Sequence, residues 1–139
     1  MEYIYADIEL INGEDLTLFR KHIIGEDEIK RMPVSILVDK GSYLLAINEN
    51  IQEQLKLPVV EQRKAQLTNG RIIDCDVVAP VELKFKNRRT TCRAIVLPKD
   101  STPILGRIPF DDMDVLIHPI KRELIVNPDH PYFAQMKMK

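Results

Sequence analysis

Short apolar runs, separated by turn residues, make up most of the chain. Runs of four to nine residues with partial alternation are typical of strands, and the nine prolines punctuate them. A further apolar run occupies residues 43–47. The pattern predicts a mostly β chain, with strands at residues 3–11, 32–38, 64–67, 71–78, 81–86, 91–97, 114–118 and 122–127.

The first charged segment has a different periodicity. Residues 14–31 carry four apolar side chains at helical spacing, which predicts a helix with a break at Gly25. The apolar positions are Leu16, Phe19, Ile23 and Ile24.

Shorter helices are expected further along the chain. Asn48 is a preferred N-cap residue, so it predicts a helix over residues 49–57 that Pro58 ends. Residues 110–113 could form a single helical turn.

Two hairpins are indicated by their turn residues. Thr68-Asn69-Gly70 separates two extended runs, and an Asn-Gly pair in that position is a strong hairpin signal. A second hairpin is expected around residues 87–89.

The length of 139 residues predicts one domain, and 45% hydrophobic residues suffice for a core. We divide residues 1–139 into an N-terminal strand-and-helix extension (1–31), a core (32–127) and a polar, only partly ordered tail (128–139). A net charge of −1 gives no general attraction to nucleic acid or to an anionic membrane. With no apolar run of about 18 residues and no basic segment at the N-terminus, a cytoplasmic location is the simplest expectation.

The cysteines and histidines give no sign of a metal site or a cofactor. Cys75 and Cys92 are far from any CxxC pattern and are expected to be reduced thiols. The three histidines are scattered through the chain. A basic hairpin is expected to be the solvated face of a strand, with nucleic-acid binding as the weaker alternative; it carries Lys84, Lys86, Arg88, Arg89 and Arg93.

Two motifs stand at opposite ends of the β-rich region. Residues 36–42 read ILVDKGS, so an apolar strand ends at Asp39, two residues before Gly41. Some 65 residues later, two aliphatic residues precede a glycine in Ile104-Leu105-Gly106. A short predicted helix and the Asn-Gly hairpin lie between the two motifs.

In this order the motifs resemble the retropepsin-type aspartic proteases, the single-domain relatives of the retroviral proteases. The family core has two apolar residues, Asp-Thr/Ser-Gly, a flap hairpin, and then two apolar residues followed by Gly-Arg. Here these pieces are residues 37–42, residues 66–72 and residues 104–107. The resemblance covers residues 32–127, and it extends to a bacterial branch with a strand and helix before the catalytic strand.

The resemblance implies an all-β acid-protease fold, a closed barrel-like half-domain with a flap and one or two short helices. It also implies an aspartic endopeptidase that acts as a homodimer on a peptide or protein substrate, without a metal or cofactor. Asp39 would be the catalytic acid and base, one from each subunit. Gly41 and Ser42 would shape its loop, and Thr68, Asn69 and Gly70 would form the flap tip. The loop would be supported by Lys40, Ile104, Leu105, Gly106 and Arg107.

Lys40 departs from the family pattern, which has Thr or Ser after the catalytic Asp. An ammonium beside a twofold axis is costly to bury unless it is paired. Three outcomes are open: Lys40 turns outward, the dimer forms differently or not at all, or the protein is an inactive relative that serves as a binding or assembly module. Tyr43 stands where retroviral members have an Asp that pairs with the arginine, so Arg107 needs another partner. Its candidates are Asp111, Asp112 and Asp114.

Overall fold

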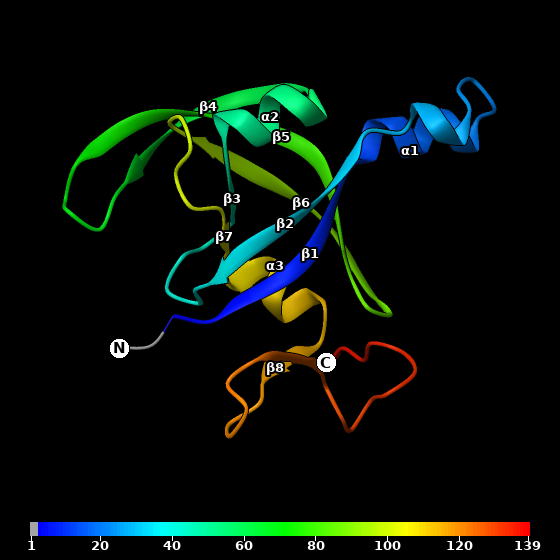
Figure 1. The fold of residues 1–139 in the computed structure, drawn as a ribbon, viewed down its shortest axis with the longest axis vertical. Helices are drawn as coiled ribbons and strands as arrows, with labels where there is room; N and C mark the ends of the chain where they lie inside the picture. The colour runs from blue at the N-terminus through cyan, green and yellow to red at the C-terminus, as the bar shows by residue number, and fades with distance from the viewer. Residues whose placement is uncertain (1–2) are drawn as a thin grey trace.

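A closed β-barrel forms the centre of the computed structural model, which describes residues 3–139 (Figure 1). Among these residues the strands are β1 (Tyr5–Asn12), β2 (Arg31–Val38), β3 (Leu45–Asn48), β4 (Val59–Gln66), β5 (Ile72–Phe85), β6 (Arg88–Leu97), β7 (Ile104–Leu105), β8 (Val115–Ile117) and β9 (Leu124–Val126). The helices are α1 (Gly13–Arg20), the 3-10 helix η1 (Glu26–Glu28), α2 (Glu49–Leu55) and α3 (Arg107–Asp112).

The barrel closes because β1 pairs with strands on both of its sides. The strand order is β1-β2-β7-β3-β6-β5, and an antiparallel pairing of β1 with β5 completes the ring. Among the described strands, β4 pairs only with β5, and the two extend from the barrel as a long arm, residues 59–78 (Figure 1). The all-β fold with few short helices, expected from the resemblance, is confirmed.

Alternating side chains of the barrel strands fill its interior. Ala6, Ile8 and Leu10 of β1 point inward, and Ile8 and Leu10 are at most 2% exposed. They meet Ile36 of β2 and Leu83 of β5 in one apolar cluster. Each such side chain contributes about 1.5–3 kcal/mol when it is fully buried, so β1 is part of the core even though it lies within the segment described as an extension.

The predicted helix over residues 14–31 is wrong in its length. α1 ends at Arg20, and His22 takes a left-handed conformation with a φ of 61°. The chain then turns back, and Ile24 and Ile29 pack against Leu16 in a small second core that also contains Ile11. Burial of these residues on two sides of a turn outweighs the helical spacing of the apolar positions.

Asn48 caps α2 as predicted, because its side-chain Oδ1 accepts a hydrogen bond of 2.8 Å from the N–H of Ile51. The helix ends at Leu55, earlier than residue 57. Gln52 binds both the N–H and the C=O of Leu57, which fixes a left-handed turn at Lys56 with a φ of 49°.

β5 is one long strand where the sequence pattern suggested two. It continues past Pro80, which has no N–H to donate to a neighbouring strand. The register with β6 shifts between Val78 and Val81, so the bulge takes Pro80 out of the ladder. α3 likewise begins at Arg107, three residues before the predicted turn.

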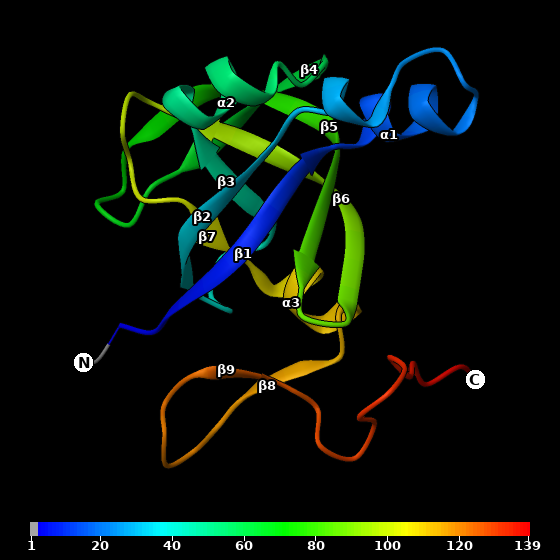
Figure 2. The same cartoon turned by 45° about the vertical axis from the view of Figure 1, so that its right-hand side comes forward.

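A two-stranded sheet of β8 and β9 lies beneath the barrel (Figure 2). Asp114 joins it to the tail, because its carboxylate accepts hydrogen bonds from Asn127, at 3.0 Å, and from the N–H of Gln135, at 3.0 Å. His130 Nδ1 lies 2.7 Å from the same carboxylate. Burial opposes ionisation, but these hydrogen bonds and His130 lower the pKa of Asp114 to about 2.

Arg88 connects this Asp114 cluster to the barrel. Its side chain is 0% exposed, and its guanidinium donates to the backbone oxygens of Asp114 and His130. Asn87 donates to the backbone oxygens of Pro131 and Tyr132. The first half of the tail is therefore fixed to the hairpin of β5 and β6, while residues 131–139 remain exposed.

Candidate active site

The Asp39 loop follows β2 and is wrapped around β7. The two residues of β7 lie between β2 and β3, parallel to the first and antiparallel to the second. The N–H of Asp39 donates to the carbonyl oxygen of Leu105 at 3.0 Å, and the N–H of Arg107 donates to that of Ser42 at 2.8 Å. The backbone on both sides of Asp39 is thus held by the Ile-Leu-Gly segment, as the resemblance implied.

Gly106 allows this close approach. A Cβ at this position would lie 2.1 Å from the carbonyl oxygen of Leu44 and 2.8 Å from that of Ser42. Both atoms belong to the backbone and cannot move aside as a flexible side chain would. Any other residue would push β7 away from the loop that holds Asp39.

The carboxylate of Asp39 is organised by its own loop. Its Oδ1 accepts a hydrogen bond of 2.9 Å from the N–H of Gly41, and Ser42 Oγ lies 3.5 Å from its Oδ2. A Cβ on Gly41 would stand 3.1 Å from the same Oδ1, which is tighter than ordinary contact. Gly41 and Ser42 therefore shape the loop around Asp39, and the half-buried carboxylate keeps acceptor capacity for a further partner.

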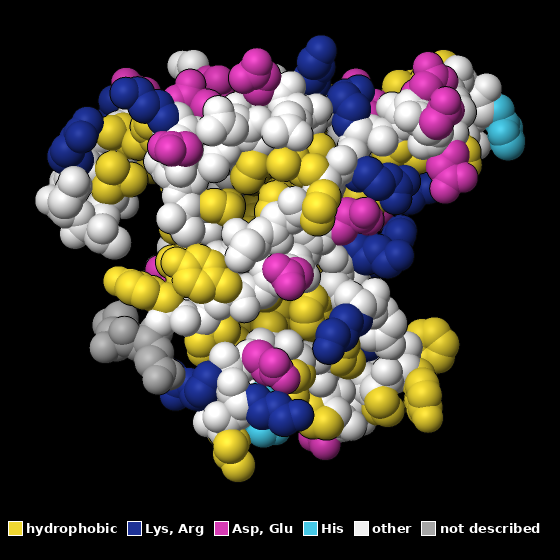
Figure 3. All heavy atoms as spheres, in the orientation of Figure 1, with side chains coloured by type: hydrophobic (Ala, Val, Ile, Leu, Met, Phe, Trp, Pro, Cys, Tyr) yellow, Lys and Arg dark blue, Asp and Glu magenta, His cyan; other side chains and the backbone are white. Residues whose placement is uncertain are grey.

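A groove of about 1020 Å³ opens beside the loop. Asp39, Gly41 and Ser42 lie on one side, and Thr68 and Asn69 of the β4–β5 hairpin lie on the other. Figure 3 shows the groove as the notch beneath the arm at the upper left. Residues about 30 positions apart in sequence therefore line one cavity, and Ile104 contributes to it from β7.

The hairpin tip has the turn that its sequence predicts. Gly70 has a φ of 85°, in the left-handed region that favours glycine, and its N–H donates to the carbonyl oxygen of Leu67 at 2.9 Å. Asn69 Oδ1 accepts from the N–H of Arg71 at 2.9 Å. Gly70 itself supports the turn and does not line the groove, whereas its neighbours do.

Apolar side chains cover the inner wall of the groove. Leu67 on the arm faces Ala46, Ile95 and Ile104 of the barrel in one cluster, which also contains Leu97, Ala65, Ile73 and Cys75. Among the described residues that line the groove, Asp39 is the single acidic one.

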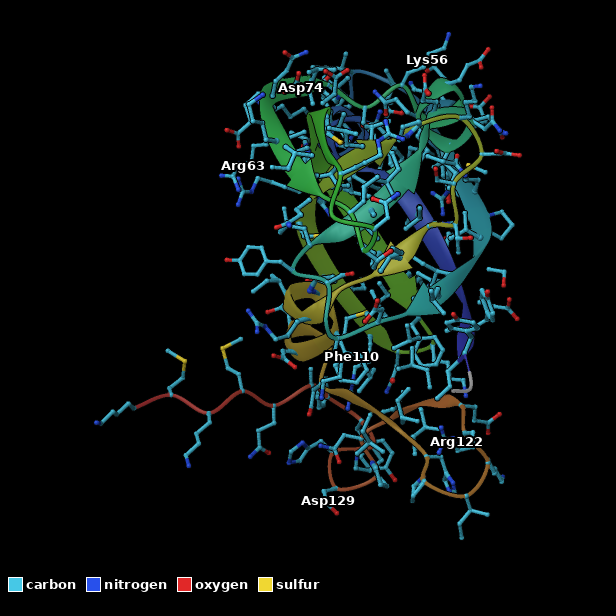
Figure 4. The ribbon with its side chains drawn as sticks, turned by 90° about the vertical axis from the view of Figure 1, so that its left-hand side faces the viewer. Lys56, Arg63, Asp74, Phe110, Arg122 and Asp129 are labelled. Atoms are coloured by element: carbon cyan, nitrogen blue, oxygen red, sulfur yellow. The ribbon has the colours of Figure 1, made fainter. Side chains whose placement is uncertain are left out.

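Lys40 points away from the carboxylate that precedes it. Its Nζ lies 4.9 Å from the centre of the Phe110 ring of α3, which Figure 4 labels below the barrel. Among the described residues it forms no ion pair with Asp39. Within one chain, this arrangement corresponds to the first of the three outcomes, an outward-turned lysine.

The expectation of an acidic partner for Arg107 is wrong. Its guanidinium lies 5.6 Å from the centre of the Tyr43 ring, a cation–π contact. Asp112 instead accepts a hydrogen bond of 2.6 Å from Thr90, and Asp114 is held by the tail. Because the N–H of Ile108 binds the carbonyl oxygen of Tyr43, the two side chains are held side by side, and the aromatic residue takes the place of the acid.

The cysteines and the basic hairpin, the other candidates for a functional role, have structural roles. Both cysteines are free thiols, and burial, followed by Asp112, raises the pKa of Cys92 to about 12. The positive charge of the basic hairpin is largely compensated, because Arg88 is buried, Arg89 pairs with Glu82 at 3.3 Å and Arg93 pairs with Glu61 at 3.0 Å.

Residues 3–139 contain no group of three or more His, Cys, Asp or Glu side chains placed to hold a metal. No helix in the described part of the chain has the length and apolar composition needed to span a membrane.

Comparison with known proteins agrees with this geometry. A search of curated proteins gave no match. The sequence model of the family described as aspartyl protease matches residues 26–110, which includes Asp39, the arm and Gly106. Because the match covers more than half of the 139 residues, the chain belongs to the aspartyl protease family.

Proposed function

We propose that the protein is an aspartic endopeptidase, active as a homodimer in which each subunit contributes Asp39. The observation that supports it best is the position of Asp39, on a loop clasped by β7 and open to a groove roofed by the β4–β5 hairpin. Asp-x-Gly occurs once in the chain, so a second copy must supply the second carboxylate.

The proposed chemistry needs two carboxylates that share one proton. Such a pair cannot easily carry two negative charges, so one member is ionised and the other is protonated. The ionised member takes a proton from a water molecule, whose oxygen attacks the peptide carbonyl carbon, while the other donates its proton to the carbonyl oxygen. As the C–N bond of the tetrahedral intermediate breaks, the carboxyl group that took the proton from water gives it to the departing amine. A hydroxyl proton of the intermediate returns to the other carboxylate, which restores the single shared proton.

The surface around Asp39 suits a subunit contact. Tyr5 pairs with Leu37, two residues before Asp39, and is 52% exposed. Tyr43 and Ile108, on the far side of the loop, are 54% and 39% exposed. A twofold contact through this region would bury these apolar side chains and bring the two Asp39 residues together.

The arm supplies the proposed flap. β4 has one partner strand and exposes most of its side chains, so its outer backbone groups are free for an extended peptide to pair with. Thr68 and Asn69 at its tip would fold over the bound peptide and exclude water.

The test is cleavage of a diverse peptide library at acidic pH by the wild type and by Asp39→Asn. We expect the variant to lose cleavage while its circular dichroism stays unchanged, because an amide can still accept the Gly41 hydrogen bond. Asp129→Asn is the matched control, since Asp129 is an exposed tail residue that Figure 4 shows far from the arm. Full activity of Asp39→Asn would refute the proposal.

Lys40 favours a second candidate, an inactive relative that acts as a binding or assembly module. In a dimer, two lysines would lie near the axis, where the family has small hydroxyl residues. Wild-type protein that cleaves nothing from acidic to neutral pH would support this candidate. Cleavage gained by Lys40→Thr would assign the loss to this one side chain.

A further inference from the structure

The charges along the groove are unequal. Within residues 3–139, Asp39 is the one acidic residue that lines it, whereas three basic residues do so: Arg63, Lys64 and Arg71. All three belong to the arm, so the positive charge lies opposite Asp39 and on the side that would cover a bound peptide.

The strand register places two of these cations on the inner face of the arm. Side chains alternate along a strand, and Arg63 is two residues before Ala65, which packs in the apolar cluster of the groove. At the other end, Arg71 follows the turn opposite Leu67, a second member of that cluster. Lys64 lies on the outer face instead, where its Nζ pairs with Asp74 at 2.9 Å.

The inner cations are incompletely neutralised. Arg63 and Arg93 share one carboxylate, Glu61, at 3.3 and 3.0 Å, which leaves one of the two positive charges uncompensated. Glu61 does not line the groove, whereas Arg63 does. The Arg71 guanidinium forms no ion pair or side-chain hydrogen bond within residues 3–139. Figure 4 shows Arg63 and Asp74 on the arm, well above Phe110.

We propose that the groove selects peptides in which an apolar centre is flanked by acidic side chains. The apolar wall takes the central residues, and Arg63 and Arg71 pair with carboxylates on either side of it. This inference rests on the proposed function in taking a peptide as the ligand. In a homodimer, the second arm would present the same cations to the other half of the peptide, so the preference would hold on both sides of the cleaved bond.

The first experiment measures binding without cleavage. Three fluorescent peptides share a Leu-Phe centre and carry two Glu, two Gln or two Lys residues on its flanks. Asp39→Asn protein is titrated with each peptide, and fluorescence anisotropy gives the dissociation constants. We expect the Glu peptide to bind about tenfold more tightly than the Lys peptide, with the Gln peptide between them, and the difference to shrink at high salt. Equal affinities, or no binding of any peptide, would overturn the inference.

The second experiment assigns the preference to the arm. In the same Asp39→Asn background, the double change Arg63→Glu with Arg71→Glu should reverse the order of the Glu and Lys peptides. Lys84→Glu with Lys86→Glu changes the net charge equally at the opposite end of β5, away from the groove, and should leave the order unchanged. An order that the arm variant leaves unchanged would also overturn the inference.

Wild-type cleavage of the same peptides separates the two proposals. Cleavage with equal kcat/KM for all three peptides would contradict the charge preference and support the protease. Preferential binding of the Glu peptide without any cleavage would support the preference and contradict the protease.

Discussion

Two aspartates, on the loop after β2 and between α3 and β8, show how differently a fold can hold a carboxylate. Asp114 is enclosed by Asn127, His130 and the N–H of Gln135, and these contacts lower its pKa to about 2. Asp39 has one short hydrogen bond, from Gly41, and borders a groove. A carboxylate surrounded by donors is fixed as an anion and stabilises the fold, whereas one with few donors keeps lone pairs available for a further hydrogen bond.

The largest expected effect is the loss of peptide cleavage when wild-type protein is mixed with an Asp39→Asn variant, compared with an Asp114→Asn variant. If both Asp39 residues are needed, an equilibrated mixture of one part wild type and nine parts Asp39→Asn has about 1% of the activity of wild type alone at the same total protein concentration. This is the square of the wild-type fraction, because most wild-type chains pair with a variant. Peptide cleavage after slow equilibration measures this. Asp114→Asn under the same conditions should give no such suppression. Activity that falls only to about 10% would point to a working monomer.

Gly106→Ala should lower the free energy of unfolding far more than the same substitution at the hairpin tip, Gly70→Ala. The added Cβ would overlap the Leu44 carbonyl oxygen, so we expect a loss of at least about 3 kcal/mol in the free energy of unfolding. Urea denaturation measures it. Gly70→Ala is the control, since a Cβ there meets nothing within 4 Å and only its φ of 85° is unfavourable, at about 1 kcal/mol. Equal losses would contradict the proposed close approach.

Asp114→Asn should remove a pH-dependent part of the stability. The folded pKa, about 2, lies below the ordinary value of 3.8, so the unfolded chain takes up the proton first as pH falls. The stabilisation is complete above pH 3.8 and is lost as pH falls to about 2. The variant should lose about 2 kcal/mol at neutral pH, from hydrogen bonds to a charged group.

Urea denaturation between pH 2 and pH 6 tests this prediction. The wild type should lose stability more steeply than Asp114→Asn in the acidic part of this range. Asp129→Asn, in the same tail, should follow the wild type. Parallel curves for the wild type and Asp114→Asn would show that the Asp114 cluster does not lower the pKa.

Lys40→Met should have the smallest effect. The contact of Lys40 with Phe110 is exposed, so its loss costs about 0.5 kcal/mol of stability, and a lysine that points away from Asp39 is not needed for cleavage. Thermal unfolding and kcat/KM measure the two properties. Lys86→Met removes a similar contact, 5.4 Å from the Phe85 ring, and serves as the control. A change in kcat/KM of more than about tenfold, for Lys40→Met alone, would show that Lys40 acts on the site.

The local features of the fold and the order of the motifs could be predicted from the sequence. Asn48 and Gly70 were predictable because an N-cap and a left-handed turn depend on few neighbouring residues. The placement of the Asp39 loop on β7 was predictable only through the resemblance, since a two-residue strand has no periodicity of its own. Residues 104–106 would otherwise read as an ordinary aliphatic turn.

Contacts between distant residues were beyond the sequence pattern. α1 ends early because Ile29 returns to pack near Ile11, which no local spacing records. The Asp114 cluster joins residues from β6, the end of β9 and the tail, so its members look unrelated along the chain. The Arg107–Tyr43 contact was missed because an acid was sought where an aromatic ring serves, although Tyr43 at that position was a usable signal.

β1 closes the barrel, although it lies outside the residues that match the family model. A polypeptide trimmed to the matched residues 26–110 would retain Asp39 and the groove but lack β1. The flanks of β2 and β5 would then be unpaired, and Ile8 and Leu10 would leave a void between them. Open flanks of this kind recruit other chains, so such a fragment should precipitate, and the boundary for any minimal expression product lies upstream of Tyr5.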